Sequence, residues 1–291
     1  MADLSFISWV QGFSSPVLDG FFRVITLLGD QEYYMVVIPL VYWLWSKEFG
    51  IRFTLVFMIS IYLNAAIKYN YATERPDMAV RLIEEDGFSF PSGHAQGNTV
   101  FWGYLARELH RRWAYVVAAV LIFLVAFSRV YLGVHFPVDI IAGVLIGLII
   151  LALFEFLQRR YRHQLTDRAY FLLTGGVVVL LFLVQSFGLA PVVLGYALAA
   201  LWGYRLEKRL VGSEVRAAWW QHVIKAVLGL VVLFGLRQLT RTLFIGLPGV
   251  AEEQELLHAI LTFLRYFVMG IWVTLAAPWV FKVARLYRSA E

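Results

Sequence analysis

The feature that most constrains this chain is a series of apolar segments, each close to the length of helix that crosses a lipid bilayer. A bilayer core about 30 Å thick needs about 20 residues of helix. Segments of this kind, bounded by charged residues or by glycine and proline, occur at residues 16–29, 31–46, 51–69, 92–110, 113–130, 137–158, 168–187, 189–204, 217–237 and 258–282. With 60% hydrophobic and only 15% charged residues, the chain does not fit a water-soluble domain. The pattern predicts an all-α fold, a polytopic membrane helix bundle.

Basic residues are distributed unevenly between the two sides of this predicted bundle. If successive segments alternate in direction, 16 of the 25 Lys and Arg residues fall on one side and 6 on the other, and the remaining 3 lie within segments. Cytoplasmic loops carry the excess of basic residues, so we expect the first side to be cytoplasmic, with both termini there. The expected location is a plasma or inner membrane. Orientation accounts for the net charge of +5, and we expect no nucleic-acid partner.

A charged stretch at residues 158–168 divides the chain into two parts with different content. The first part contains every polar cluster that the apolar segments carry, whereas the second consists of plain hydrophobic segments. We therefore expect a membrane domain with a functional site at residues 1–158, and additional transmembrane helices of unknown role at residues 159–291. The chain contains no cysteine, which excludes thiolate metal sites and cysteine nucleophiles.

Three polar clusters lie at the predicted non-cytoplasmic ends of the segments, and all three therefore face the same side. They are KYNYATERP at 68–76, PSGH at 91–94 and SRVYLGVHFPVD at 128–139. Ionisable groups at this depth are costly and usually mark a functional site. Lys68, Arg75 and Arg129 bring three positive charges together, and a guanidinium group matches the geometry of phosphate oxygens. The clusters predict an anion site that suits phosphate.

Helix starts and histidines complete the predicted site. Ser92 is placed to cap a helix and Gly93 allows close backbone approach, so free amide groups would face the same anion. His135 and Asp139 are four residues apart, so the carboxylate can hold one imidazole nitrogen and leave the other free as a nucleophile. His94 is then the natural general acid, because imidazole titrates near neutral pH.

These spacings resemble those of the type 2 phosphatidic acid phosphatase (PAP2) superfamily. Its motifs KxxxxxxRP, PSGH and SRxxxxxHxxxD all occur without departure, and the resemblance covers about residues 16–158. It implies a six-helix PAP2-like catalytic core, to which this chain adds about four C-terminal transmembrane helices. It also implies metal-independent hydrolysis of lipid phosphates through a phosphohistidine intermediate, with no cofactor. By the resemblance, the nucleophile, its orienting residue and the acid are His135, Asp139 and His94, and the phosphoryl oxygens are held by Lys68, Arg75, Ser92, Gly93 and Arg129.

The expected function is that of an integral membrane lipid phosphatase, with a lipid phosphate as substrate and membrane lipids around it. The substrate is expected to be a phosphomonoester or diphosphate of the undecaprenyl diphosphate, phosphatidate or sphingoid-base phosphate class. A lipid phosphotransferase using the same site is an alternative, as is a non-enzymatic lipid transporter, although the second half offers few polar groups to line a path. A histidine and an aspartate four apart can also be metal ligands, but three neighbouring cations disfavour a metal ion.

Overall fold

The computed structural model describes residues 4–160, 166–185, 188–244 and 255–287, and within these ranges it contains helices and no strands. This confirms the all-α prediction. The elements in chain order are α1 (Ser5–Gln11), α2 (Pro16–Thr26), η1 (Leu27–Gly29), α3 (Gln31–Leu40), η2 (Val41–Trp45), α4 (Lys47–Tyr71), η3 (Met78–Val80), α5 (Gly93–Leu109), α6 (Arg112–Tyr131), α7 (Pro137–Arg160), α8 (Asp167–Val184), α9 (Ala190–Leu206), η4 (Glu207–Val211), α10 (Trp219–Phe244), α11 (Glu255–Ile271), η5 (Trp272–Ala276) and α12 (Ala277–Val283).

Several of these helices are long and apolar enough to cross a membrane. In the described part of the chain, six continuous stretches meet this condition, namely α4, α6, α7, α8, α10 and Glu255–Val283. The helices α5 and α9, each of 17 residues, cover two further predicted segments. The pair formed by α2 with η1 and α3 with η2 is bent by 52° at its break and passes the same test only when taken together, as a broken span or a re-entrant loop. The chain is an integral membrane protein, as its composition predicts.

The chain forms two compact units. The first contains Met1–Met35 and Ile59–Arg162, and the second contains Val36–Met58 and His163–Glu291. The unit boundaries fall within α3 and α4, so that residues 36–58 group with the C-terminal helices. The division into domains 1–158 and 159–291 stays a prediction.

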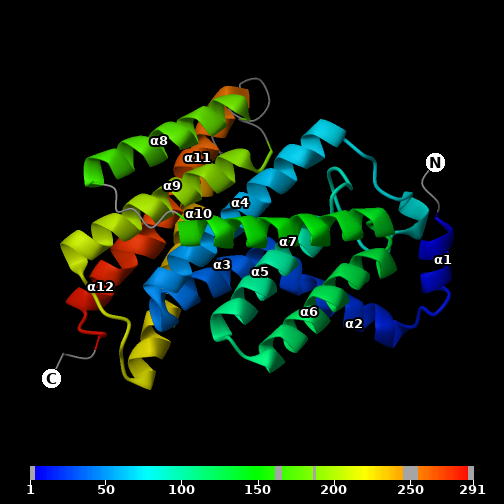
Figure 1. Cartoon of the computed structure of the whole chain (residues 1–291), viewed down its shortest axis with the longest axis horizontal. Coiled ribbons are helices and arrows are strands. Elements are labelled where there is room, and N and C mark those ends of the chain that lie inside the picture. The colour runs from blue at the N-terminus through cyan, green and yellow to red at the C-terminus, as the bar shows by residue number, and fades with distance from the viewer. Residues whose placement is uncertain (1–3, 161–165, 186–187, 245–254, 288–291) are drawn as a thin grey trace. The chain divides into compact units, whose positions relative to one another are not determined.

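In the first unit, α5 packs against both α6 and α7 (Figure 1). Two glycines of α7 allow this close contact, because a Cβ atom at Gly143 would lie 2.7 Å from the carbonyl oxygen of Ser92 and one at Gly147 would lie 2.8 Å from Cβ of Thr99. The backbone N–H of Ser92 donates to the carbonyl oxygen of Asp139 at 3.1 Å. The contact therefore fixes the first turn of α7 against the start of α5. The other face of α7 is exposed and apolar.

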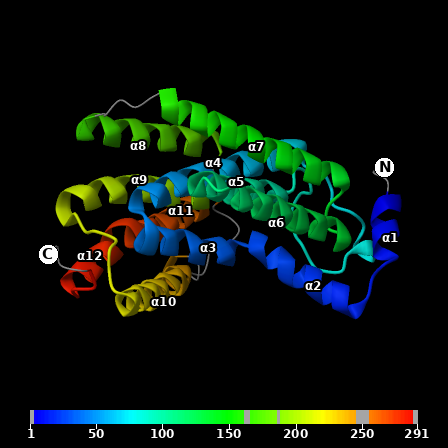
Figure 2. The ribbon, with the colours of Figure 1, turned by 60° about the horizontal axis from the view of Figure 1, so that its bottom comes forward.

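The N-terminal helices lie at the end of the first unit where α6 ends (Figure 2). The side-chain amide of Gln11 donates to the carbonyl oxygens of Val80 at 2.8 Å and Tyr131 at 2.9 Å, and the Tyr131 hydroxyl donates to Asp19 at 2.6 Å. The N-terminal helix α1 thus lies on the same side as the loop at 72–92. The axes of the pair α2–η1 and the pair α3–η2 differ by 52° at their break, and the side of the membrane on which the N-terminus lies stays a prediction.

In the second unit, α9 packs along α11, and the buried polar groups bind one another. Lys47 contacts Glu207 at 2.5 Å, and the same Glu207 oxygen accepts hydrogen bonds from the N–H and hydroxyl groups of Ser213. Lys225 is fully buried and donates to the carbonyl oxygen of Val215 at 3.1 Å. These contacts satisfy charges that would otherwise be costly in a low-dielectric interior.

Candidate active site

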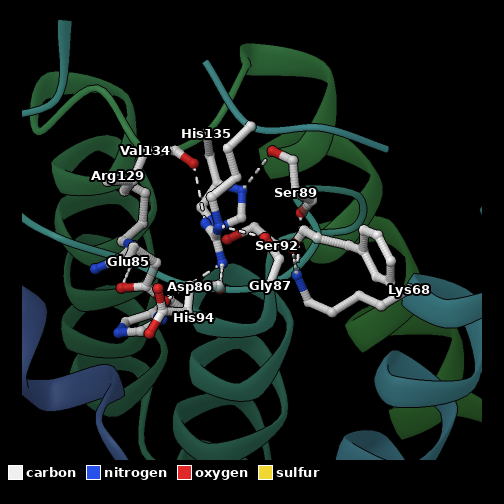
Figure 3. Close-up of polar contacts among 12 residues, drawn as sticks. Lys68, Glu85, Asp86, Gly87, Ser89, Ser92, His94, Arg129, Val134 and His135 are labelled. Carbon is white, nitrogen blue, oxygen red and sulfur yellow. Dashed lines mark hydrogen bonds and ion pairs between the residues drawn. The ribbon is translucent and has the colours of Figure 1, made fainter. Parts of the chain in front are cut away.

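The three polar clusters meet at one end of the first unit. Figure 3 shows His135 between Lys68 and Ser89 on one side and Arg129, Glu85 and His94 on the other. The side chains come from the end of α4, the loop at 72–92, the start of α5, the end of α6 and the turn into α7. Hydrogen bonds and ion pairs, in part through Ser89 and Glu85, join six of the eight residues predicted from the sequence, namely Lys68, Arg75, Ser92, Arg129, His135 and Asp139. The other two, Gly93 and His94, directly follow Ser92 at the start of α5.

Asp139 orients the His135 ring. Its Oδ2 atom lies 3.4 Å from His135 Nδ1 and also accepts from the backbone N–H of Phe136 at 2.9 Å and from the Ser89 hydroxyl at 2.5 Å. A carboxylate oxygen in this position only accepts, so Nδ1 carries the ring proton. The other ring nitrogen, Nε2, lies 3.2 Å from Nη1 of Arg75. The lone pair of Nε2 is therefore directed at the cationic side of the pocket.

The electrostatic surroundings keep the His135 imidazole neutral. The side chain is 1% exposed, and burial lowers its pKa well below the usual value of a histidine. The positive charges of Arg129, Arg75 and Lys68 lower this pKa further, because each repels a protonated ring. A neutral imidazole is the form that a nucleophile requires.

Backbone carbonyl groups hold two of the three cations in place. The acceptors lie in the loop at 86–89 and in the turn before α7. Lys68 donates to the carbonyl oxygens of Phe88 and Ser89, and Arg75 donates to those of Asp86 at 2.9 Å, Gly87 at 3.0 Å and Val134 at 3.0 Å. These acceptors carry no full charge, so they hold the two side chains in place without neutralising them.

Arg129 and Arg75 share one carboxylate, that of Glu85. The buried Arg129 donates from Nη1 to the Thr26 hydroxyl at 2.7 Å and from Nη2 to Glu85 at 2.6 Å, while Nη2 of Arg75 lies 3.5 Å from Glu85. Nε of Arg129 has no hydrogen-bond partner among the described residues. Burial opposes the ionised form of Glu85, but Arg129, His94 and Arg75 outweigh it and hold the pKa of Glu85 below its usual value.

Sequence reasoning did not single out Glu85 or Ser89. Both lie in the segment between the first two motifs, and no spacing rule connects them with their partners. The available signal was chemical, since an acid and a hydroxyl occur in a short loop that joins a basic motif to PSGH.

His94 binds a carboxylate that lies far away in the sequence. Its Nε2 atom is 3.0 Å from Oδ1 of Asp30, at the break between α2 and α3. Sequence reasoning missed Asp30 as well, although a lone carboxylate between two apolar segments was a visible signal. The contact leaves Nδ1 of His94 as the nitrogen that can serve a ligand.

The PSGH turn is anchored from α4. Ser92 caps α5 by accepting the N–H of Ala95 at 3.4 Å, as predicted from the sequence. The Asn64 amide donates to the carbonyl oxygen of Pro91 at 3.3 Å, and a Cβ atom at Gly93 would lie 3.2 Å from Oδ1 of Asn64. These contacts fix the helix start, whose free amides and positive dipole end favour an anion.

The described residues contain no group of three or more His, Asp or Glu side chains placed to hold a metal ion. What the pocket does contain is a set of groups for an oxyanion, with three cations, a helix start and two imidazoles, each imidazole bound to a carboxylate. Such a set can bind a phosphoryl group, attack it and protonate its leaving group.

Comparison with known proteins agrees with this chemistry. A family model described as the PAP2 superfamily matches residues 49–164, and one described as the PAP2 superfamily phosphatase, transmembrane extension, matches residues 191–289. The helices from α9 to α12, which the three motifs do not explain, thus match a recognised extension.

Individual relatives match about half of the chain. Phosphatidylglycerophosphatase B of Bacillus subtilis is 32% identical over 165 residues, which are 51% of this chain and 81% of that protein. The putative undecaprenyl-diphosphatase YbjG of Escherichia coli is 30% identical over 151 residues, 46% of this chain and 73% of that protein. Sphingosine-1-phosphate phosphatase 1 of Rattus norvegicus is 28% identical over 141 residues, 44% of this chain and 32% of that protein. The chain therefore belongs to the PAP2 superfamily of membrane phosphatases and carries the transmembrane extension of that superfamily.

Proposed function

We propose that this protein hydrolyses a lipid phosphomonoester or lipid diphosphate through a phosphohistidine formed on His135. The observation that carries the proposal is the state of His135, a neutral ring with Nδ1 bound to Asp139 and Nε2 beside Arg75. Lys68 and Arg129 add positive charge at the position where the transferring phosphoryl group gains negative charge.

Two displacements at phosphorus complete the reaction. In the first, Nε2 of His135 attacks, the nitrogen–phosphorus bond forms, the bond from phosphorus to the lipid oxygen breaks, and His94 gives a proton to the departing oxygen. In the second, water attacks phosphorus and gives a proton to His94 as the nitrogen–phosphorus bond breaks. The products are inorganic phosphate and the lipid with one phosphate fewer, which is an alcohol from a phosphomonoester and a lipid monophosphate from a diphosphate, whose bridging oxygen is the departing oxygen. Both histidines return to their starting states.

The substrate is proposed to belong to the undecaprenyl diphosphate, phosphatidate or sphingoid-base phosphate class. The names of the three relatives support a lipid phosphate, because one is named for phosphatidylglycerophosphate, one for undecaprenyl diphosphate and one for sphingosine 1-phosphate. They differ in headgroup and in the lipid part, and they share a phosphate at the end of a membrane-embedded molecule. We therefore propose that the site recognises the terminal phosphate and not one particular headgroup.

The site is proposed to face the non-cytoplasmic side, with the C-terminus in the cytoplasm. The support is the distribution of 16 against 6 basic residues between the two sides. Three of the six, Lys68, Arg75 and Arg129, belong to the pocket itself. This count does not depend on the N-terminal segment, because Arg23 is the only basic residue before Lys47. By its packing, α1 shares the outer side with the site.

A phosphate-release assay tests the function. The purified protein in detergent, given phosphatidate, phosphatidylglycerophosphate, sphingosine 1-phosphate and undecaprenyl diphosphate with EDTA present, is expected to release phosphate and to be inhibited by vanadate. His135→Ala should lower turnover by about 10³-fold or more, since it removes the nucleophile, and His110→Asn should not. Activity that is lost on chelation and restored by Mg²⁺ or Zn²⁺ would identify the histidines as metal ligands. Transfer to an added alcohol without release would identify a phosphotransferase.

Trapping of the intermediate tests the mechanism separately. With a ³²P-labelled substrate and an alkaline quench, we expect label on the wild-type protein and none on His135→Ala. His94→Ala should still become labelled when the substrate has a good leaving group, because such a group departs without a proton. Label on His135→Ala would rule out His135 as the nucleophile.

A further inference from the structure

The break between α2 and α3 contributes to the pocket, although it lies outside the three motifs and outside the matched residues 49–164. The hydroxyl of Thr26, which is 5% exposed, accepts from Arg129 at 2.7 Å, and Asp30 lies 3.0 Å from His94. One short segment of the first span therefore supplies an acceptor both to a phosphate-binding cation and to the second histidine.

We infer that Asp30 is the positioning residue of His94. Its carboxylate accepts the Nε2–H group of the imidazole, which fixes the tautomer and the plane of the ring and assigns proton delivery to Nδ1. The inference rests on the proposed function, in which His94 is the acid. His94 and His135 are then each held by an aspartate, but through opposite ring nitrogens.

Packing around the ring supports a fixed orientation. A Cβ atom at Gly29 would lie 2.2 Å from Cδ2 of His94, so the imidazole rests directly on the Gly29 backbone. The Asn98 amide nitrogen, 3.0 Å from the same Cβ position, donates to the backbone carbonyl oxygen of His94 at 3.0 Å, and the Asn98 side-chain oxygen accepts from the Trp102 indole at 3.0 Å. The ring can keep this position only where residue 29 has no side chain.

The charged groups around His94 show which carboxylate can stabilise the protonated form of its ring. The charged groups that face the ring are Arg129 from α6, Glu85 from the loop at 72–92 and Asp30 from the break. Arg129 repels a protonated imidazole, and Glu85 is already paired with Arg129 at 2.6 Å. Asp30 is therefore the carboxylate that directly stabilises the protonated ring in this arrangement.

The chemical step defines what Asp30 affects. As the bond from phosphorus to the lipid oxygen breaks and the bond to His135 forms, the Nδ1 proton of His94 moves to the departing oxygen. Asp30 retains its hydrogen bond to Nε2–H and does not take up the proton. A weakly basic leaving group departs without protonation, so its release should not depend on Asp30.

The test compares two phosphate esters. Asp30→Asn should lower kcat by about 10- to 100-fold for phosphatidate, whose leaving group is an alkoxide, because general acid catalysis contributes at least that much. With p-nitrophenyl phosphate, whose leaving group is a stable phenolate, kcat should stay within about threefold of the wild type. Asp19→Asn is the matched control, since Asp19 lies in the same span and binds Tyr131 at 2.6 Å, away from His94.

A second pair of variants changes the ring position instead of the carboxylate. Gly29→Ala should cause the same selective loss on phosphatidate, whereas Gly20→Ala, with no atom within 4 Å of the added Cβ, should not. With an active wild-type enzyme, an equal loss on both esters in Asp30→Asn and Gly29→Ala, or an unchanged kcat for phosphatidate, would overturn this inference alone. A wild-type enzyme that hydrolyses neither ester would overturn the proposed function as well.

Discussion

At the scale of single residues, the pocket contains an anion of its own. The Glu85 carboxylate lies between Arg129 and Arg75, where a phosphoryl group would bind the same guanidinium groups. Glu85→Gln should therefore strengthen vanadate inhibition by about fivefold, or about 1 kcal/mol, because a neutral amide competes less well for the two cations. Inhibition constants measured for this variant and for Glu84→Gln, which changes an exposed neighbour, would check it. Weaker vanadate binding in Glu85→Gln would mean that Glu85 holds the arginines in place rather than competing with the ligand.

The state of His135 predicts a particular pH dependence. Its pKa lies well below the usual value of a histidine, and a nucleophile is active only when unprotonated. Activity should therefore persist as the pH falls through 6.5. The decrease in kcat/KM that protonation of the enzyme causes, the enzyme limb of the pH profile, should lie below that pH. The charged groups around the ring that set this behaviour are Arg75, Arg129, Lys68, His94 and Asp139.

Two substrates with different phosphate pKa values separate this enzyme limb from titration of the substrate. If the pH at which kcat/KM falls differs between the two substrates, the substrate phosphate is the group that titrates. If that pH is the same for both, the group belongs to the enzyme. An enzyme limb above pH 6.5 would contradict a neutral His135 in the resting site.

Residues whose partners are close in sequence could be placed before the structure was known. Ser92 caps the helix that follows it, and His135 reaches Asp139 because four residues make about one helical turn. Glu85 and Asp30 could not be placed in this way, since each meets a partner more than 40 residues away. Loop conformation decides such contacts, and no periodic pattern encodes it.

At the scale of elements, the arrangement of α2 and α3 could not be predicted from the sequence pattern alone. A Gly-Asp pair between two short apolar segments fits a turn between two spans as well as a break within one. The hydrogen bonds of Gln11 to Val80 and Tyr131 favour a break within one span, and these are tertiary contacts. The helices from α4 onward were easier to predict, because charged residues, or glycine and proline, bound each long apolar run.

The contact between Lys47 and Glu207 in the second unit predicts a large effect on stability. Their side chains are 11% and 2% exposed, so Glu207→Ala leaves a mostly buried ammonium group without its carboxylate. The expected cost is about 3–5 kcal/mol in the free energy of unfolding, measured by reversible unfolding in detergent. The double variant Lys47→Met/Glu207→Leu should recover most of this loss, because no unpaired charge remains. A single variant as stable as the wild type would show that the pair contributes nothing.

At the scale of the whole molecule, sidedness can be tested by labelling, because the chain has no cysteine of its own. Ala79→Cys lies in the exposed part of the site loop and Glu214→Cys in an exposed loop of the second unit. A membrane-impermeant maleimide should label the first in intact cells and the second only after lysis. The reverse pattern would place the site on the cytoplasmic face.

A third cysteine tests the bent first span. Ser14→Cys lies in the exposed connection between α1 and α2. It should react from outside together with Ala79→Cys, because α1 and the site loop share one end of the first unit. Reaction of Ser14→Cys only after lysis would indicate that α2 and α3 cross the membrane as two separate spans before α4.

The two faces of α7 should differ sharply in the substitutions they accept. Positions 143 and 147 have no room for even a methyl group, because α5 lies directly against them. Ile141, Leu145 and Leu148, with exposed fractions of 60%, 54% and 51%, face outward and should accept any apolar residue, since lipid chains adapt to the shape they meet. In a saturation mutagenesis library of α7, the number of tolerated substitutions should therefore vary with a helical period. It should be lowest at Gly143 and Gly147.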